Sequence, residues 1–414
     1  MKKLITNANI FNGKQDIIYK GQYLIIVDNL INKIGNSSEL DKKTFDTFDQ
    51  VLDLKNKYLI PGLIDAHVHI ASADVNINDD NKTETYIGIK SAVYLNETLY
   101  RGFTTVRDAG GADWGMEQAI DEGIIEGPRL FRSEKALSQT FGHGDVRYKT
   151  KNIYEGSVNS DSGTYIAVIC DGVDGVRKAA RDQLRKGAAQ IKIMAAGGVA
   201  SPTDKISNLQ FSEEETKAIV EEAKNAGTYV MAHVYTPEGI IRCVKLGIRS
   251  IEHGNLINDE AAEVVKVNDA YVVPTLAIYD SVYKKGSEFG FPQHSMKKLE
   301  DVRKQCINGV KICRKHNLNI GFGTDLLGDL KSDQCNEFLL RSKAETLFET
   351  LNSATYVNSK LLNMEGKLGI ISEGAYADLI VYNSNPLQDI SVFTKPEESL
   401  KLIIKNGNII KNSL

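Results

Sequence analysis

The chain has 414 residues, of which 42% are apolar and 25% are charged, a composition typical of a folded globular protein. At roughly 100–200 residues per domain, this length corresponds to two domains, or to one large α/β barrel with an attachment. The formal net charge of −4 provides no broad basic surface. We therefore expect neither nucleic acid nor an anionic membrane as a partner.

The cysteines and the N-terminus bear on the cellular compartment. The five cysteines are odd in number, and no Cys-x-x-Cys pair occurs among them. This pattern argues against a disulfide framework or a thiolate zinc site, and it favours a reducing, cytoplasmic location. Asn7 and Asn9 interrupt the apolar stretch that a secretory signal would need. No window holds 18 uninterrupted apolar residues, so we expect no membrane-spanning helix.

The two ends of the chain have the same character. Residues 1–57 and 366–414 both consist of short strand-like runs separated by turn signals, and Asn406-Gly407 is typical of a hairpin turn. Each end is too small to form a stable domain alone. We expect the two ends to pair into one small, composite β-sandwich.

Residues 58–365 alternate strand-like apolar runs with segments of helical period. The clearest helix is expected over 213–225, with Ser212 as N-cap, Glu215 at the capping-box position and Gly227 just past the end. Eight such strands alternating with helices predict a parallel (β/α)8 TIM barrel of the α/β class. The eight expected strands are 58–70, 104–109, 129–133, 190–195, 229–235, 250–253, 270–276 and 319–325.

Histidines gather at the expected C-terminal ends of these strands, where barrels of this kind carry their active sites. His67 and His69 end the first strand and share one face, because they are two residues apart. His233, His253 and Asp325 end the fifth, sixth and eighth strands. A lone histidine on a strand is more often a hydrogen-bonded core residue. This convergence instead predicts a site for a divalent metal ion such as zinc, which imidazole and carboxylate ligands suit.

Several segments resemble the amidohydrolase superfamily over nearly the whole chain. PGLIDAHVH (61–69) is similar to its strand-one signature, and GTD (323–325) to its strand-eight aspartate. Four further segments resemble one branch of this superfamily, the binuclear zinc dipeptidases and carboxypeptidases grouped with prolidases. They are GGVASPTD (197–204), AHVYT (232–236), IEHGNL (251–256) and TDLLG (324–328). Members of this branch cleave Xaa-Pro or related dipeptides and N-acyl amino acids. Related imidazolonepropionases open a ring amide on the same scaffold.

The resemblance implies two divalent metal ions, most simply zinc, bridged by a carboxylated lysine. Lys192 lies in the fourth expected strand. A bare ammonium would be repelled by two dications, whereas a carbamate supplies two anionic oxygens; a structural lysine that reaches the barrel rim is the alternative. The strand-one pair and the aspartate would hold the more buried ion, and the other two histidines the more exposed one. The implied ligand set is His67, His69, Lys192, His233, His253 and Asp325.

Three residues are expected to act on the substrate. The resemblance implies that His143 polarises the scissile carbonyl; branch members usually have Gly-Gly-His here, whereas Phe141 replaces the first glycine in this chain. Tyr235 follows His233 on the same face, and it either binds a substrate carboxylate or packs the barrel rim. Asp325 would take the proton from the attacking hydroxide and pass it to the leaving nitrogen.

The resulting hypothesis is an enzyme that hydrolyses amide bonds of Xaa-Pro or other dipeptides and N-acyl amino acids by attack of a metal-bridging hydroxide. A cyclic-amide hydrolase similar to imidazolonepropionase is one alternative. A mononuclear deaminase is another, but such enzymes usually lack the lysine and carry a glutamate where this chain has Thr236. A non-enzymatic scaffold would have lost its ligands. Relatives in this branch often form large homo-oligomers, so the resemblance also implies a homo-oligomer.

Overall fold

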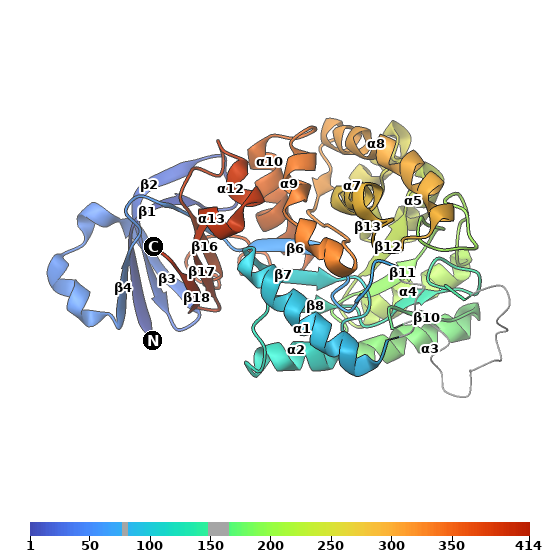
Figure 1. The fold of residues 1–414 in the computed structure, drawn as a ribbon, viewed down its shortest axis with the longest axis horizontal. Coiled ribbons are helices and arrows are strands. Elements are labelled where there is room, and N and C mark those ends of the chain that lie inside the picture. Colours follow the sequence, from blue (N-terminus) through green and yellow to red (C-terminus); the bar gives the residue numbers. More distant parts are fainter. Residues whose placement is uncertain (77–81, 148–164) are drawn as a thin grey trace. The chain divides into compact units, whose positions relative to one another are not determined.

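The computed structural model describes residues 1–76, 82–147 and 165–414 (Figure 1). The contacts divide the chain into two compact units. The first unit comprises Met1–Asp65, Asn96–Thr105 and Glu345–Leu414, and the second comprises Ala66–Leu95 and Val106–Ala344. Strands β6 (Leu63–Val68) and β7 (Phe103–Asp108) and helix α1 (Glu84–Tyr100) each begin in one unit and end in the other.

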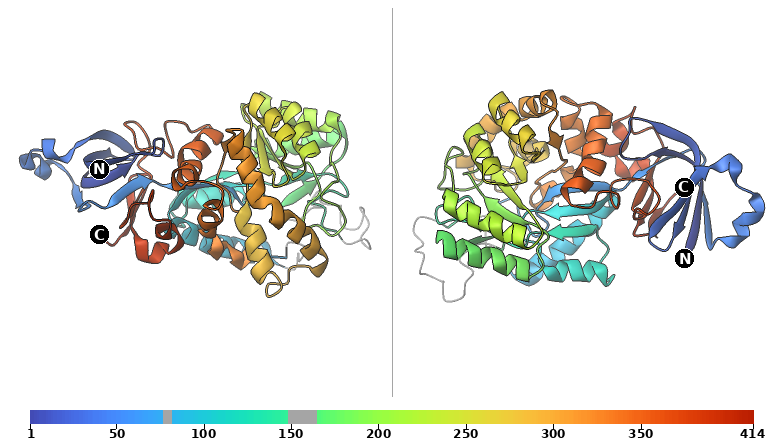
Figure 2. Two further views of the ribbon diagram at one scale, coloured as in Figure 1. Left: turned by 90° about the horizontal axis from the view of Figure 1, so that it is seen from above. Right: turned by 180° about the vertical axis from the view of Figure 1, so that it is seen from behind.

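The first unit contains one eight-stranded sheet built from both ends of the chain, and both termini lie in it (Figure 2). The strand order is β18-β17-β16-β5-β1-β2-β3, with β4 paired to β1. The sheet comprises β1 (Lys2–Phe11), β2 (Ile18–Val27), β3 (Leu30–Asn36), β4 (Gln50–Asp53), β5 (Tyr58–Pro61), β16 (Leu379–Tyr382), β17 (Leu400–Lys405) and β18 (Asn408–Asn412). Strand β5, which pairs with β1 and with β16, joins the two ends in this sheet. The expected first barrel strand, 58–70, is thus divided, with β5 in this sheet and β6 among the parallel strands. A sandwich of two packed sheets stays a prediction.

Local sequence explains the last turn of this sheet. Asn406 and Gly407 connect β17 to β18, and both have positive φ, 51° and 76°. A hairpin turn of this kind requires positive φ at both central residues. A side chain at Gly407 would also collide with the backbone oxygen of Asp28. The predicted Asn-Gly hairpin is therefore confirmed.

The short helices of this unit are η1 (Ser37–Glu39), η2 (Lys42–Thr47), α10 (Leu347–Asn352), η5 (Ser353–Val357), α11 (Asn358–Leu361), α12 (Ser391–Thr394) and α13 (Pro396–Ser399).

The second unit is built on parallel strands. A seven-stranded sheet has the order β10-β9-β11-β12-β13-β14-β15, and β6-β7-β8 form a three-stranded sheet. The backbone N–H of Ala66 in β6 donates to Phe322 O just after β15, at 2.8 Å. This arrangement is consistent with the expected TIM barrel. The strands are β8 (Arg129–Arg132), β9 (Ala136–Ser138), β10 (Ala167–Ile169), β11 (Ile191–Met194), β12 (Val230–Val234), β13 (Ser250–His253), β14 (Tyr271–Val273) and β15 (Asn319–Ile320).

Helices follow most of these strands and pack in neighbouring pairs. Helix α3 contacts α4, α5 contacts α6, and α7 contacts α8. The helices are α2 (Trp114–Asp121), α3 (Gly172–Arg185), α4 (Glu213–Asn225), α5 (Pro237–Lys245), α6 (Asp259–Val267), α7 (Leu276–Lys285), η3 (Gln293–Ser295), α8 (Met296–Lys315), η4 (Gly328–Asp333) and α9 (Asn336–Arg341). The prediction for α4 is confirmed, with its capping box between Ser212 and Glu215 and with Gly227 at φ 73°.

Two short strands differ from the sequence prediction. The expected third strand, 129–133, is followed by a separate strand, β9, after Glu134 at φ 59°. Strand β10 was not expected at all. Both β9 and β10 are three residues long, too short to show the period-two pattern on which strand prediction depends.

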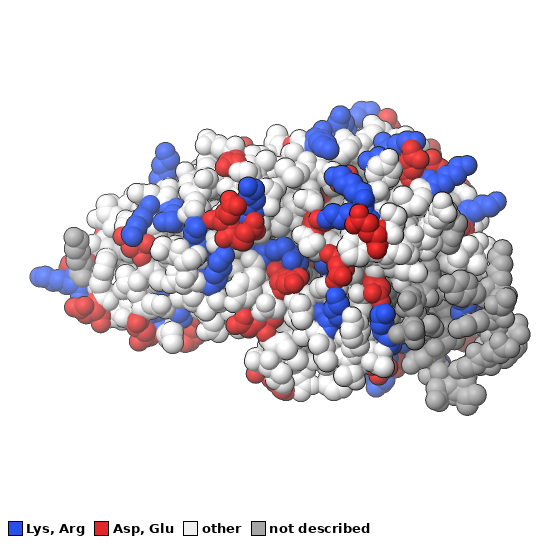
Figure 3. All heavy atoms as spheres, in the orientation of Figure 1, with Lys and Arg blue, Asp and Glu red and all other residues white. Residues whose placement is uncertain are grey.

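The surface charges, the cysteines and the helices can be compared with the sequence. Lysine and arginine intermingle with aspartate and glutamate on the face drawn in Figure 3. All five cysteines are buried and unbonded to one another. Among the described helices, none is both long and apolar enough to cross a membrane.

Candidate metal centre

The six expected ligands are carried by different strands but line one pocket of the second unit. His67 lies in β6 and His69 just after it, Lys192 lies in β11, and His233 in β12. His253 ends β13, and Asp325 follows β15. Parallel strands bring their carboxyl ends to one face, so residues far apart in sequence meet here.

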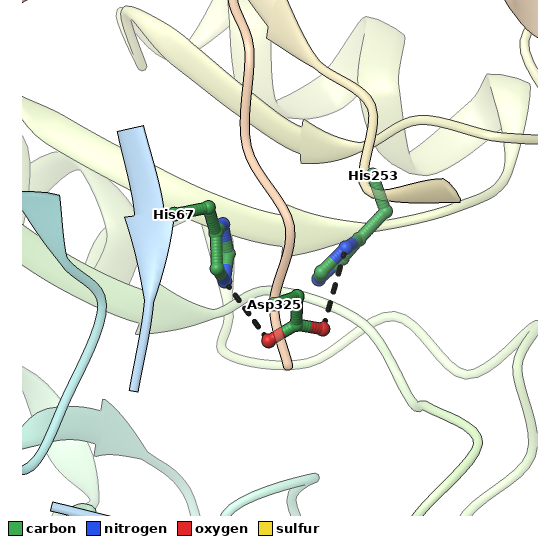
Figure 4. A group of neighbouring side chains, drawn as sticks. All are labelled: His67, His253 and Asp325. Carbon is green, nitrogen blue, oxygen red and sulfur yellow. Dashed lines mark ion pairs between the residues drawn. The ribbon is translucent and has the colours of Figure 1, made fainter. Parts of the chain in front are cut away.

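Asp325 lies at the centre of the histidines. Its Oδ1 is 3.4 Å from His67 Nε2 and 3.3 Å from His69 Nε2. Its Oδ2 is 3.9 Å from His253 Nδ1. Figure 4 shows the imidazoles of His67 and His253 approaching this carboxylate from two sides. One ligand atom from each of these three residues lies within 4.8 Å of the others, which is a spacing that one ion can bridge.

His233 completes the histidine cluster. Its ring centroid is 4.6 Å from that of His253. Within the described part of the chain, its buried Nε2 has no hydrogen-bond partner. A buried polar atom without a partner is costly, and a divalent ion would supply the missing partner. The donor set therefore fits a divalent metal.

The protonation states also suit a metal. Burial holds the pKa of His233 and that of His253 well below their usual range, so both rings are neutral and keep a lone pair. Burial acts to raise the pKa of Asp325, but the neighbouring rings of His67 and His69 outweigh it and hold this pKa well below its usual range. Neutral imidazoles and an ionised carboxylate are the forms that bind metal.

Two of the expected ligands have an uncommon backbone conformation. His253 has φ 69° and Asp325 has φ 57°. Non-glycine residues with positive φ are uncommon, and such strain gathers at functional sites. The local backbone at both strand ends is thus consistent with a site that constrains where these side chains point.

Three histidines are held from behind by a second partner. His67 Nδ1 lies 2.6 Å from Glu252 Oε2, His69 Nδ1 lies 2.8 Å from the carbonyl oxygen of Gly110, and His253 Nδ1 lies 2.7 Å from Thr275 Oγ1. Such partners fix the tautomer and orientation of a ligating imidazole, with Nε2 left for the metal. None of these three partners was predicted from the sequence. Only Glu252 gave a signal, as an acidic residue next to the expected ligand His253.

Glu252 is itself held by a buried arginine. Arg107 Nη2 donates to both carboxylate oxygens, at 2.9 and 3.0 Å, and Arg107 Nε donates to Ala66 O at 2.6 Å. Burial acts to raise the pKa of Glu252, but the Arg107 guanidinium outweighs it and lowers the pKa to about 2. The ionised carboxylate can only accept, so His67 must carry its proton on Nδ1.

Lys192 is 1% exposed and lines the same pocket. Burial lowers the pKa of its ammonium to about 8, although the carboxylates of Glu252 and Asp325 favour the charged form. A substantial share of the amine is therefore neutral near pH 8. A neutral amine is the form that can react with carbon dioxide.

His143 lies where the sequence placed it, beside the histidine cluster. Its ring stacks on that of His233 with centroids 4.2 Å apart. Its Nδ1 lies 2.9 Å from Ser201 Oγ, and its backbone N–H donates to Gln210 Oε1 at 2.8 Å. Phe141 keeps a positive φ of 66°, the region that favours glycine. Phe141 thus has a backbone conformation that favours glycine, at the position where the resemblance implies a glycine.

The structure shows the packing of Tyr235 and leaves its carboxylate role a prediction. Its ring stacks on that of His253 with centroids 5.2 Å apart, and its hydroxyl lies 3.1 Å from that of Tyr279. Both tyrosines are buried and line the pocket. The ring therefore packs against a candidate ligand, while the hydroxyl stays within the pocket.

Apolar side chains form the rest of the pocket wall. They come from the segment after β11, from α7 and α8 and from the loops beside them. The main contributors are Val199, Ile278, Val282, Phe291, Leu299 and Leu327. A site with convergent polar groups at one end and an apolar wall at the other is typical of a small-molecule pocket.

Comparisons with known proteins agree with this geometry. A crystal structure of a prolidase complexed with N-methylphosphonate-L-proline has a TM-score of 0.95 and 40% sequence identity, and the match covers 100% of both chains. A crystal structure of a Xaa-Pro dipeptidase with bound methionine has a TM-score of 0.88 and 30% identity, again over 100% of both chains. The ochratoxinase of Aspergillus niger is 32% identical over 399 residues, which cover 94% of this chain and 82% of that protein.

Residues 58–410 match the amidohydrolase family. The match spans most of the chain, and the resemblance inferred from the sequence motifs is confirmed. The chain belongs to the amidohydrolase family and is a hydrolase that acts on carbon–nitrogen bonds.

Proposed function

We propose that this enzyme hydrolyses the amide bond of small substrates, namely Xaa-Pro or other dipeptides and N-acyl amino acids, with two divalent metal ions, most simply zinc. The observation that carries the proposal is the meeting of four histidines, a lysine and an aspartate in one pocket. Similarity to a prolidase whose ligand contains proline supports this substrate class.

His67, His69 and Asp325 would hold one ion, and His233 and His253 the other. A carbamate on Lys192 would bridge the two, which its burial beside the histidines and its lowered pKa support. When bound, the two ions would supply Lewis-acid polarisation and a hydroxide nucleophile near neutral pH.

The remaining chemistry falls to the protein itself. Asp325 is ionised and central to the cluster, so its carboxylate can take the proton released during attack and deliver it to the leaving nitrogen. His143, whose ring stacks on that of His233, would polarise the scissile carbonyl. The apolar wall would exclude water from the bound side chain and would accept the ring of a proline residue.

The deaminase alternative is disfavoured by two observations. Lys192 lies in the pocket. Thr236, where such deaminases carry a glutamate, caps helix α5 by accepting from Gly239 N through its side chain. A capping threonine has no acidic group for proton transfer.

The proposed domain organisation follows the same family pattern. We place a metal-dependent hydrolase barrel at residues 58–365 and a composite β-sandwich at 1–57 and 366–414. The eight-stranded sheet and the parallel seven-stranded sheet support two such parts, although β5 belongs to the eight-stranded sheet and the first compact unit also includes residues 345–365.

The experiment is a screen of Xaa-Pro dipeptides, other dipeptides and N-acyl amino acids with zinc-loaded enzyme. Release of free amino acid from at least one of these classes would support the proposal. A cyclic-amide hydrolase would open a ring amide and leave linear dipeptides intact, and a deaminase would release ammonia alone. Either result would contradict the proposal.

Substrate polarity gives a second test of the same site. If Tyr235 binds a free carboxylate, amidation of a good dipeptide removes a hydrogen bond to a charged group, which is worth about 1.5–3 kcal/mol. kcat/KM should then fall roughly 10- to 100-fold. Tyr235→Phe should lower activity on the free acid only. Equal cleavage of both substrates would leave Tyr235 with its packing contact alone.

A further inference from the structure

A buried hydrogen-bond network lies next to His143, and its centre is the carboxylate of Asp204. The side chain of Asp204 is fully buried. His143 Nδ1 is 2.9 Å from Ser201 Oγ, and Ser201 Oγ in turn donates to Asp204 Oδ1. His143, Ser201 and Asp204 thus form a chain that ends on a carboxylate outside the metal-ligand set.

Gly198 N donates to Oδ2 of this carboxylate at 3.2 Å, Gln210 Nε2 donates to Oδ2 at 3.1 Å, and Lys298 Nζ lies 3.5 Å from Oδ1. His143 Nδ1 itself lies 3.7 Å from Oδ2. Burial acts to raise the pKa of Asp204, but His143 first, and then Ser201 and Lys298, lower it below the usual range. Asp204 is therefore an ionised, acceptor-only group.

Lys298 of helix α8 holds the loop that carries this chain. Its ammonium donates to three backbone carbonyl oxygens of the loop, those of Gly198 at 2.9 Å, Ser201 at 3.0 Å and Asp204 at 2.8 Å. Three donors on one ammonium match three acceptors on one loop. The loop, and with it Ser201 and Asp204, is therefore fixed to α8 before any substrate arrives.

The ring of His143 is confined on both of its faces. One face stacks on His233 at 4.2 Å between centroids. On the other side, the backbone of Gly198 comes so close that a Cβ there would collide with the imidazole. This confinement fixes the plane of the ring but does not determine which ring nitrogen carries a proton.

The hydroxyl of Ser201 determines the protonated nitrogen of His143. A hydroxyl has one proton, and the carboxylate of Asp204 can only accept it. Ser201 Oγ must then accept from His143, so Nδ1 carries a proton. We infer that Asp204, acting through Ser201 and through the 3.7 Å contact of its own Oδ2, is a positioning residue that holds a proton on Nδ1 of His143 and so fixes the ring beside the pocket. The use of this ring by a substrate rests on the proposed function; the proton position does not.

The same contacts explain residues of one sequence motif. From the sequence alone, GGVASPTD (197–204) showed only a family resemblance. Gly198 now provides the close approach to the ring, Ser201 the relay and Asp204 the terminal acceptor.

The first test observes the proton directly by NMR of 15N-histidine-labelled, zinc-loaded enzyme. The wild type should show a hydrogen-bonded Nδ1–H of His143, identified by its loss in His143→Gln. Ser201→Ala should abolish that signal or shift the ring toward the Nε2–H tautomer. If Ser201→Ala does not fold, Asp204→Asn should give the same change. An unchanged Nδ1–H signal in the variant, or a wild-type ring without a proton on Nδ1, would overturn the inference.

The second test measures coupling in a double-mutant cycle on a dipeptide substrate. Ser201→Ala should lower kcat/KM about 10-fold, the loss expected when one hydrogen bond no longer orients the ring. In the His143→Gln background it should cause no further loss, because the residue it positions is gone. Ser201→Thr, which keeps the hydroxyl, should recover most of the activity. Multiplicative effects of the two substitutions would contradict a positioning role.

A matched control separates this effect from general loss of a buried hydroxyl. Ser359 is buried in the first unit and donates to the backbone oxygen of Tyr356. Ser359→Ala should leave kcat/KM and the NMR signal of His143 unchanged. If the wild type cleaves no dipeptide or N-acyl amino acid, the proposed function fails, while the NMR result still decides whether Asp204 positions His143.

Discussion

Glu252 Oε2 lies 2.6 Å from Nδ1 of His67, and neither side chain is exposed to solvent. The same carboxylate accepts two hydrogen bonds from the buried Arg107. Arg107 therefore holds Glu252, and Glu252 holds the imidazole, whose Nε2 is directed toward Asp325. A chain of buried polar contacts thus links a strand that carries no ligand to the candidate metal centre.

Substitution of Glu252 should weaken metal binding. Glu252→Gln keeps the volume but removes the charge that fixes the proton of His67, and zinc affinity should fall roughly 10- to 100-fold. Competition with a chromophoric chelator measures this affinity. Glu222→Gln is the matched control, since Glu222 also pairs with arginines, Arg177 and Arg181, but lies on α4 and does not line the pocket. Equal zinc affinity in Glu252→Gln and wild type would contradict the positioning of His67.

The lysine prediction can be tested without activity. The pKa of Lys192 is lowered to about 8, so its neutral, reactive amine increases as the pH rises through about 8 and decreases below it. At a fixed concentration of dissolved carbon dioxide, the 13C-carbamate signal of the metal-free enzyme should follow the same rise. Lys192→Ala should lack the signal, bind less metal and lose activity. Full activity with two metals in Lys192→Ala would rule out the bridge.

The prediction for Asp325 separates charge from shape. Asp325→Asn keeps the size of the side chain but removes its capacity to accept a proton. We expect kcat to fall on the order of 10²-fold or more, with an unchanged circular dichroism spectrum. A variant within about tenfold of the wild type would show that another residue moves the proton.

Much of this site could be read from the sequence because its residues obey local rules. His67 and His69 stand two apart on a strand, and Asp325 follows a strand end, so period and position alone placed them at one mouth. The hairpin at Asn406-Gly407 and the capping box of α4 were equally local. By contrast, Glu252 meets His67 from 185 residues away, and Asp204 meets His143 both through Ser201 and at 3.7 Å directly. Contacts of this kind depend on tertiary packing, which leaves no periodic signal.

The strain at Phe141 yields a stability prediction. A residue with a Cβ is destabilised by roughly 1–2 kcal/mol in the left-handed region. Glycine avoids this strain, and its loss of chain entropy on folding is only about 0.5–1 kcal/mol. Phe141 is 50% exposed and has φ 66°. Phe141→Gly should therefore raise the free energy of unfolding by about 0.5–1 kcal/mol in chemical denaturation.

A second phenylalanine provides the control for this substitution. Phe289 is 38% exposed and is not among the positive-φ residues of the described chain. Phe289→Gly should lower the free energy of unfolding, because no strain is relieved there. If both substitutions destabilise the protein equally, the positive φ of Phe141 carries no cost.

Two metals and amide hydrolysis can be tested together in one titration. Metal-free enzyme is supplied with bicarbonate and with increasing equivalents of zinc, and hydrolysis of an Xaa-Pro dipeptide, or of the best substrate of the screen, is measured at each point. Activity should rise until two equivalents per chain have been added and then stay constant. Saturation at one equivalent, or hydrolysis that does not depend on metal, would contradict the two-metal amide hydrolase proposed here.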